Sequence, residues 1–168
     1  DALQNIKDQA VRMNKLVSEI SEAAIVDNDL VTKKREKFDL SKVLSEIVDH
    51  YNDTNEYPKL KFVDEIQDSI MINGLPERIG QVLVNLLDNA QTFSRPVGTV
   101  RVSLEKKWRR NPILKVEDSG PGIREELKSV VFDSFFTSRS GNAVVPNSSG
   151  LGLTIVKQII DAHNAEIT

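Results

Sequence analysis

The sequence contains no cysteine. A chain without cysteine has neither a disulfide framework nor thiolate metal ligands, and its composition fits a reducing cytosol. Long apolar runs are also lacking: none approaches the roughly 20 residues that a membrane-spanning helix needs, and no signal-peptide pattern opens the chain. The remaining composition, with 39% hydrophobic and 28% charged residues among 168, indicates one globular domain and an appendage.

An excess of positive charge is lacking too. The net charge is −3, with both signs interspersed, which argues against nucleic acid as the main partner. One basic cluster, Lys106 to Arg110 around Trp108, lies between two strand-like runs. We interpret it as a solvated hairpin turn, with a docking patch for an anionic partner as the alternative.

The first 27 residues carry an apolar pattern whose spacing alternates between three and four. The pattern consists of Leu3, Ile6, Ala10, Met13, Val17, Ile20 and Ala24. It predicts a helix with the seam of a coiled coil or a four-helix bundle, ending at Asp27-Asn28-Asp29. We favour dimerisation through this seam over packing on the chain's own domain, and expect an exposed linker at 33–37. The chain begins at Asp1 within this pattern and stops where a strand begins, so we expect it to be part of a longer polypeptide.

Helices and strands are mixed over the rest of the chain. Strands are predicted at 36–38, 60–63, 69–72, 100–104 and 113–116. Helices are predicted after the cap Asp39, from Pro76 to Ala90, at 125–130 and at 152–162. This order predicts an α+β fold in which a mixed, mostly antiparallel sheet is covered by helices on one face.

Four short motifs in the second half carry the candidate chemistry. Asn85 and Asn89 share one helix face, where carboxamide oxygens suit Mg²⁺; a solvated helix face is the alternative. Asp118 follows a strand and precedes Gly120 and Gly122. A carboxylate there accepts a hydrogen bond from an amine such as that of adenine, and the glycines admit a flat ligand; a plain turn is the alternative.

The other two motifs flank residues 137–149, which lack a periodic core. Gly150, Leu151 and Gly152 stand directly before a helix, where backbone N–H groups favour an anion, although a glycine start without a ligand is common. They form neither a Walker A loop nor a dinucleotide fingerprint. Phe132, Phe135 and Phe136 precede the segment as core residues or as anchors of a lid over a nucleotide.

In this order the motifs resemble the N, G1, F and G2 boxes of the ATP-binding domain of sensor histidine kinases, within the superfamily of gyrase, a chaperone class and mismatch-repair ATPases. RIGQVLVNLLDNA (78–90) resembles an N box, and SGLGLTIVKQIIDAH (149–163) resembles a G2 box with its helix. RMNKLV (12–17) resembles the second helix of the dimerisation and phosphoacceptor hairpin. The resemblance implies a Bergerat-type two-layer sandwich at 34–168, preceded at 1–33 by that helix and a linker.

The resemblance also implies roles. Asn89 holds Mg²⁺, Asn85 supports the metal or the phosphates, and Asp118 binds the adenine amine. The base is lined by Phe93, Gly120, Gly122 and Ile123. The phosphates of ATP are covered by Ser149, Gly150, Leu151 and Gly152, with Arg139 reaching the γ-phosphate.

Three departures from the family pattern stand out. Thr92 replaces the usual lysine, and neither His50 nor His163 matches the phosphoacceptor motif. We also expect the last two strands of the family to be missing past Thr168.

The leading hypothesis is the catalytic part of a histidine kinase, which moves the γ-phosphoryl of ATP to a histidine of the hairpin in a homodimer, for relay to a response regulator. We expect it to be the cytoplasmic domain of an inner-membrane sensor, to bind ATP and not to autophosphorylate alone. The alternatives are an ATPase, against which the amide at Asn85 argues because it is no general base, and a regulatory binding module.

Overall fold

The computed structural model describes residues 2–134 and 150–168, leaving aside the side chains of residues 2–5, 8, 12 and 15. The chain forms two compact units. Unit 1 consists of residues 1–33 and 125–168, and unit 2 of residues 34–124. The predicted boundary after residue 33 coincides with a boundary between units. The assignment of residues 34–168 to one catalytic domain stays a prediction.

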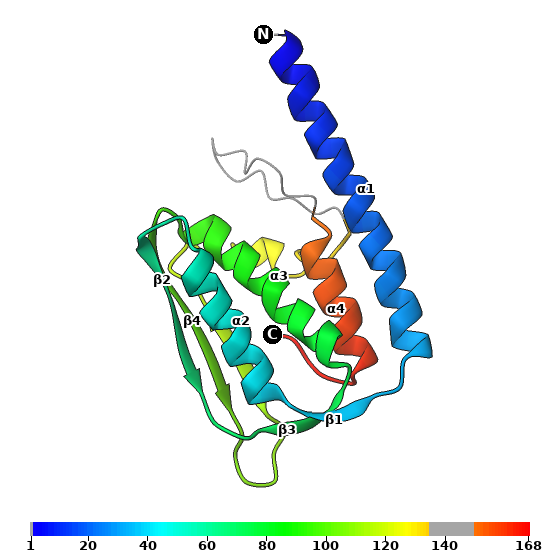
Figure 1. Ribbon diagram of the computed structural model, residues 1–168, viewed down its shortest axis with the longest axis vertical. Coiled ribbons are helices and arrows are strands. Elements are labelled where there is room, and N and C mark those ends of the chain that lie inside the picture. Colours follow the sequence, from blue (N-terminus) through cyan, green and yellow to red (C-terminus); the bar gives the residue numbers. More distant parts are fainter. Residues whose placement is uncertain (1, 135–149) are drawn as a thin grey trace. The chain divides into compact units, whose positions relative to one another are not determined.

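Unit 2 is a sheet structure covered by two helices. Its elements are β1 (Glu36–Asp39), α2 (Leu40–Thr54), β2 (Lys59–Ile66), β3 (Met71–Gly74), α3 (Pro76–Ser94), β4 (Val97–Glu105) and β5 (Ile113–Glu117). β1 pairs with β3 in an antiparallel ribbon, and a three-stranded sheet has the order β2-β4-β5. β2 and β4 are parallel, whereas β4 and β5 are antiparallel. Both α2 and α3 lie over one face of this sheet (Figure 1), and the predicted α+β class is confirmed.

The core of unit 2 lies between these helices and the sheet. Its fully buried side chains include Leu44, Leu83, Leu87, Val100, Val102 and Leu104. Every second residue of β4 is buried from Val100 onward, as expected when one face of a strand faces helices. α2 and α3 supply their apolar stripes at helical spacing, so burial of these stripes fixes both helices on the sheet.

Polar side chains fasten α2 to the strands beside it. Asp39 caps α2 by accepting the N–H of Lys42 at 3.3 Å, as predicted. The buried Ser41 hydroxyl donates to the Gln67 carbonyl at 2.6 Å and accepts the Ile70 N–H at 3.0 Å. These bonds satisfy backbone groups just before β3. Ser69 has φ +58°, outside the extended region, so the strand begins at Met71 and not at the predicted residue 69.

Unit 1 contains α1 (Ala2–Thr32), a short 3₁₀ helix η1 (Glu125–Leu127) and α4 (Gly152–Ala162). α1 and α4 pack together, and the Gln158 side chain donates to Asp27 at 3.0 Å. Val26 on α1 and Val156 on α4 are fully buried. The predicted helix at 152–162 is confirmed, whereas the helix predicted at 125–130 is a single 3₁₀ turn.

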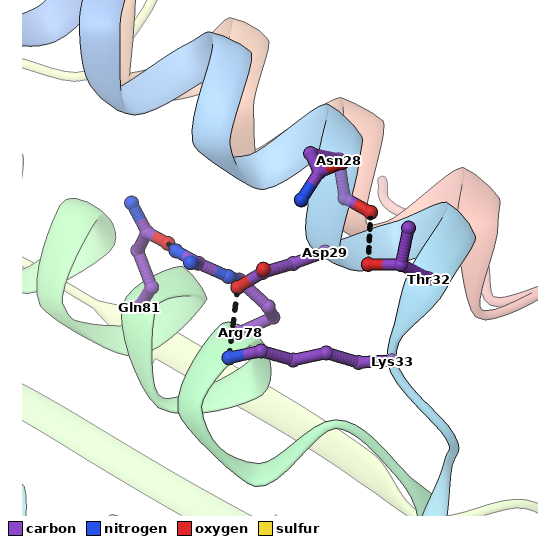
Figure 2. A network of polar contacts seen from close by, with 6 residues as sticks. All are labelled: Asn28, Asp29, Thr32, Lys33, Arg78 and Gln81. Carbon is purple, nitrogen blue, oxygen red and sulfur yellow. Dashed lines mark hydrogen bonds and ion pairs between the residues drawn. The ribbon is translucent and has the colours of Figure 1, made fainter.

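The predicted end of the first helix at Asp27-Asn28-Asp29 is wrong, because α1 continues through these residues to Thr32. Thr32 donates its hydroxyl to the Asn28 carbonyl at 2.7 Å, and Lys33 pairs with Asp29 at 3.0 Å (Figure 2). The Lys33 N–H also bonds the Asp29 carbonyl at 2.9 Å. Contacts four residues apart thus extend the helix past residues that favour caps.

The predicted seam of α1 is exposed. Ile6, Met13, Val17 and Ile20 each keep more than half of their surface accessible. Dimerisation through this seam stays a prediction. No helix in the described part of the chain is long and apolar enough to cross a membrane.

Candidate functional site

Helix α3 carries three of the predicted site residues on successive turns. Asn85, Asn89 and Phe93 are spaced by four residues, so they lie along one side of the helix. Both asparagines are half-buried, and Phe93 is exposed. Within the described residues, no hydrogen bond engages the carboxamide of Asn89. The side chain therefore retains its full capacity as a ligand.

The end of β5 leads into a turn that is closed by the predicted adenine ligand. β5 ends at Glu117, and the Gly120 N–H donates to Asp118 Oδ1 at 2.7 Å. Asp118 is exposed, so its second carboxylate oxygen faces solvent or a ligand. A carboxylate that accepts a backbone N–H is held in one orientation, as a specific hydrogen bond to a base requires.

Gly120 brings this turn against Phe93. A Cβ at Gly120 would stand 2.7 Å from Asp118 Oδ1, 3.1 Å from the Phe93 Cβ and 3.2 Å from the Phe93 carbonyl oxygen. The first distance is shorter than real Cβ atoms keep, so the Asp118 carboxylate would have to shift, and the other two distances are tighter than most Cβ contacts. Crowding therefore favours glycine at this position, and the structure brings Phe93, Asp118 and Gly120 together; their roles in binding stay predictions.

Ser119 is a positioning residue that the sequence did not reveal. Its hydroxyl accepts the Thr99 N–H at 2.9 Å and thereby ties the turn to the beginning of β4. A Cβ at Gly98 would collide with the Ser119 Oγ. The only sequence signal for this contact is the glycine at the start of a strand, which marks close approach of another group.

The second glycine of the turn serves another purpose. Gly122 has φ +74°, in the left-handed region that other residues seldom adopt, yet no atom lies within 4 Å of a Cβ placed there. The conformation of the backbone, and not crowding, requires this glycine. Ile123 follows it with 53% of its surface exposed, which leaves an apolar side chain available to a flat ligand.

The glycine-rich start of α4 belongs to unit 1. Gly150 has φ +76°, Gly152 is the first residue of α4, and the Leu151 side chain is buried. Leu151 can therefore contact a phosphate only through its backbone. The Thr154 hydroxyl donates to the Phe132 carbonyl at 3.2 Å, which joins the aromatic motif to this helix. Phe135, Phe136, Arg139 and Ser149 lie outside the described residues.

The side chains of α3 fit a magnesium ion that is held mainly by a ligand. The described residues contain no group of three or more His, Cys, Asp or Glu side chains that would hold a metal by itself. Mg²⁺ often binds through one or two protein oxygens, several waters and phosphate oxygens of a substrate. The carboxamides of Asn85 and Asn89 offer two such oxygens on one side of α3.

A separate cleft of about 450 Å³ lies between α2 and α3 and does not include the asparagines. It is lined by His50, Tyr51, Thr54, Glu56, Tyr57, Val84, Gln91, Thr92 and Arg95. Tyr51 donates its hydroxyl to Asp88 at 2.6 Å, and its burial, followed by this carboxylate, raises the pKa of Tyr51 well above its ordinary value. Thr92, which replaces the usual lysine, faces this cleft. Of the residues that line this cleft, none is among those predicted to bind the nucleotide.

Comparison with known proteins identifies the family. The family model described as "Histidine kinase-, DNA gyrase B-, and HSP90-like ATPase" matches residues 74–168. Sensor protein ChvG of Agrobacterium fabrum (strain C58) is 34% identical over 164 residues, which cover 93% of this chain and 27% of ChvG. The chain thus spans about a quarter of the length of this relative.

Solved structures agree. The Acinetobacter baumannii histidine kinase AdeS has a TM-score of 0.68 at 29% identity, over 95% of this chain and 72% of AdeS. Histidine kinase ThkA, solved in complex with response regulator protein TrrA, has a TM-score of 0.62 at 26% identity, over 81% of this chain and 40% of that one. The chain therefore belongs to the histidine kinase-, DNA gyrase B- and HSP90-like ATPase family, and its relatives place it among the catalytic domains of sensor histidine kinases.

Proposed function

We propose that this chain binds ATP with Mg²⁺ and directs the γ-phosphoryl group to a histidine side chain of a sensor histidine kinase. The observation that carries the proposal is the junction of α3 with the turn after β5, where Phe93 lies against Gly120 and the Asp118 carboxylate is held by a backbone N–H. Family membership and relatives named as sensor proteins support the same activity.

The base of the nucleotide is assigned to unit 2. Asp118 accepts the exocyclic amine of adenine through the oxygen that the turn leaves exposed. Phe93 and Ile123 offer apolar surface to the two sides of the ring system, and Gly120 leaves room for close approach. An adenine ring recognised in this way is distinguished from guanine, which carries a carbonyl where adenine carries the amine.

The phosphates are assigned to polar side chains and backbone amides. Asn89 is the proposed ligand of Mg²⁺, and Asn85 supports the metal or the phosphates. Gly150, Leu151 and Gly152 enter the proposal on their motif, since N–H groups at a helix start favour anions; Ser149 and Arg139 enter on the resemblance alone. Magnesium, when bound, neutralises the charge that develops on the transferred group.

The transfer itself asks little covalent chemistry of this chain. A neutral imidazole nitrogen attacks the γ-phosphorus, a P–N bond forms, and the bond to the bridging oxygen breaks with ADP as the leaving group. The imidazole then loses its N–H proton to solvent. Positioning of the two reactants and stabilisation of charge are the contributions of the residues named above.

Neither histidine of the chain suits the role of acceptor. His50 on α2 and His163 after α4 both lie outside a phosphoacceptor motif, and His163 contacts the Ile159 carbonyl oxygen through Nδ1 at 2.7 Å. We therefore assign the acceptor to a helix outside this sequence, and expect no autophosphorylation by this chain alone. We further propose that α1 pairs with its equivalent in a homodimer, and that the whole protein is a membrane-attached sensor. By analogy with ThkA, solved with TrrA, the phosphoryl group passes on to a response regulator.

ATP hydrolysis is the second candidate, since the family description names ATPases. Activation of water needs a general base, and the carboxamide of Asn85 cannot accept a proton at neutral pH. The kinase assignment therefore predicts slow release of free phosphate. A binding module without catalysis is the third candidate. The replacement of the usual lysine by Thr92 favours it, because one contact to the phosphates would be lost.

Calorimetry with ATP and Mg²⁺ tests the proposal. We expect saturable binding that is weakened in Asn89→Ala mainly when magnesium is present, whereas Asp118→Asn weakens binding with and without the metal. Mixing the chain with a separate helical hairpin that carries a histidine should then yield acid-labile, base-stable phosphoprotein. Binding without any transfer would favour the regulatory module, and rapid phosphate release would favour the ATPase.

A further inference from the structure

The loop between β4 and β5 presents the chain's only tryptophan to solvent. Trp108 keeps 86% of its surface exposed, and the loop projects beyond the ends of the strands of unit 2 (Figure 1). Tryptophan is highly buried on average, so exposure of nearly the whole side chain at a protruding tip is unusual. The nucleotide site does not use this residue.

The loop is an ordered turn. The Arg110 N–H donates to the Lys107 carbonyl at 3.0 Å, which closes a four-residue turn with Trp108 and Arg109 at its centre. Arg109 adopts φ +57°, and its guanidinium carbon stands 5.9 Å from the centre of the Trp108 ring. At the base of the loop, the Lys106 N–H donates to the Gln67 side chain at 2.9 Å. Trp108 is thus held outward by the turn.

Positive charge surrounds the exposed ring. Lys106, Lys107, Arg109 and Arg110 flank Trp108 in a chain whose net charge is −3. Two acidic groups stand near them: Glu105 lies 3.7 Å from the Lys107 ammonium, and Asp68 follows Gln67 on the adjoining turn. Both members of the Lys107 pair are more than half exposed, so the pair barely reduces the attraction of the tip for an anionic surface.

We propose that this tip, residues 106–110, docks onto an anionic lipid surface, with Trp108 inserted at the level of the headgroups. Tryptophan prefers the interface between water and lipid, and basic side chains are attracted by acidic headgroups. The negative charge on the rest of the chain favours an orientation in which the tip alone approaches the surface. The proposal is independent of the kinase assignment.

The shape of the tip favours lipid over a macromolecule with a fixed surface. A stable protein interface buries roughly 1,200–2,000 Å², which one convex turn cannot provide. Single-stranded nucleic acid is bound by concave basic grooves with several stacking aromatics, whereas this turn is convex and offers one ring. A bilayer accommodates a small protruding tip without a complementary shape.

Fluorescence of Trp108 provides a direct test, because tryptophan emission, excited selectively over the two tyrosines, comes from this residue alone. The chain is titrated with vesicles of phosphatidylglycerol and phosphatidylcholine, and with vesicles of phosphatidylcholine alone. We expect emission to move to shorter wavelength with the anionic vesicles only, and brominated acyl chains to quench it. Binding should weaken in about 1 M salt, where charges are screened beyond about 3 Å.

Two charge-matched variants locate the contact. Lys106→Gln/Lys107→Gln removes two charges from the tip, and Lys34→Gln/Lys37→Gln removes two exposed charges elsewhere in unit 2. Since each basic residue near an acidic membrane strengthens binding about fivefold, the first variant should bind at least tenfold more weakly, whereas the second should bind like the parent chain. Trp108→Ser, followed by vesicle sedimentation, should also lose binding while its thermal unfolding is unchanged.

Three results would overturn the proposal. The first is an unshifted emission with anionic vesicles. The second is equal weakening by the two charge variants, which would indicate general attraction without a defined tip. The third is an equal response to soluble glycerol phosphate or to an oligothymidine strand, which would assign the tip to free phosphate groups or to nucleic acid.

Discussion

Replacement of Asp118 by asparagine separates the role of this carboxylate in the fold from its proposed role in binding. Asp118 Oδ1 accepts the Gly120 N–H at 2.7 Å and closes the turn. An asparagine keeps an oxygen in that position but exchanges the second, exposed oxygen for an amino group. That group donates a hydrogen bond and would face the donating amine of adenine.

The expected magnitude follows from these two positions. Loss of a hydrogen bond to a charged acceptor costs about 1.5–3 kcal/mol, which corresponds to a decrease in ATP affinity of roughly 10- to 150-fold. The turn itself retains its hydrogen bond in neutral form, so the free energy of unfolding should fall by less than about 1 kcal/mol. Asp118→Ala removes both functions and should lower affinity and stability together.

Calorimetric titration with Mg²⁺-ATP and urea unfolding, applied to the same preparations, measure the two effects. Asp68→Asn is the matched control, since it removes one exposed carboxylate of the same unit outside the proposed site. GTP serves as a second ligand, whose binding the carboxylate should not support. If Asp118→Asn binds ATP as tightly as the parent chain, Asp118 does not contact the base. If it unfolds with the stability of Asp118→Ala, the side chain acts in the turn alone.

Further substitutions test the surrounding structure. Gly120→Ala forces a methyl group against the adjoining carboxylate and should weaken ATP binding at least tenfold in calorimetry. Gly80→Ala meets no atom nearer than 3.4 Å and should stabilise α3 by about 0.5–1 kcal/mol in urea unfolding. If Gly120→Ala binds ATP as tightly as the parent chain, the steric argument is refuted. Ser41→Ala removes two hydrogen bonds from a buried hydroxyl and should cost about 2 kcal/mol of unfolding free energy, while a change within 0.5 kcal/mol, the scatter of neutral surface substitutions, would contradict it. Because burial and the bond to Asp88 raise the pKa of Tyr51, its stabilising effect is complete below pH ~10 and is lost as the pH rises further; Tyr51→Phe should therefore flatten the decline of thermal stability in alkaline buffer, and an unchanged decline would assign it to other groups.

Local patterns predicted the four long helices and the places of the strands along the chain, because those elements follow from periodic burial. The start of α3 at Pro76 and both ends of α4 follow from residue types within a few positions. The end of α1 was not predicted correctly. Asp27 to Asp29 favour the end of a helix, but Asn28 and Asp29 form contacts with residues four positions later, and the strength of these contacts cannot be judged from the sequence. In the candidate site, Asp118 and Gly120 were visible as a motif.

Contacts between distant parts of the chain lay beyond prediction. Ser119 is an ordinary serine within the turn, and its bond to the Thr99 N–H exists only once β4 and β5 have paired. Ser41 similarly acquires its partners from the chain segment before β3. Both serines are of a common residue type, and tertiary structure alone brings their partners close. Their structural roles therefore cannot be predicted from a single sequence.

The turn after β5 is fastened before any ligand arrives. Its carboxylate is bonded inward to Gly120, and Ser119 anchors it to β4. Recognition of adenine by such a turn would require little loss of conformational entropy, since the groups that meet the base are already ordered. ATP and ADP share that base, so this part of the pocket would hold both with similar strength. Discrimination between ATP and ADP, and the rate at which one replaces the other, would then depend on the residues that bind the phosphates.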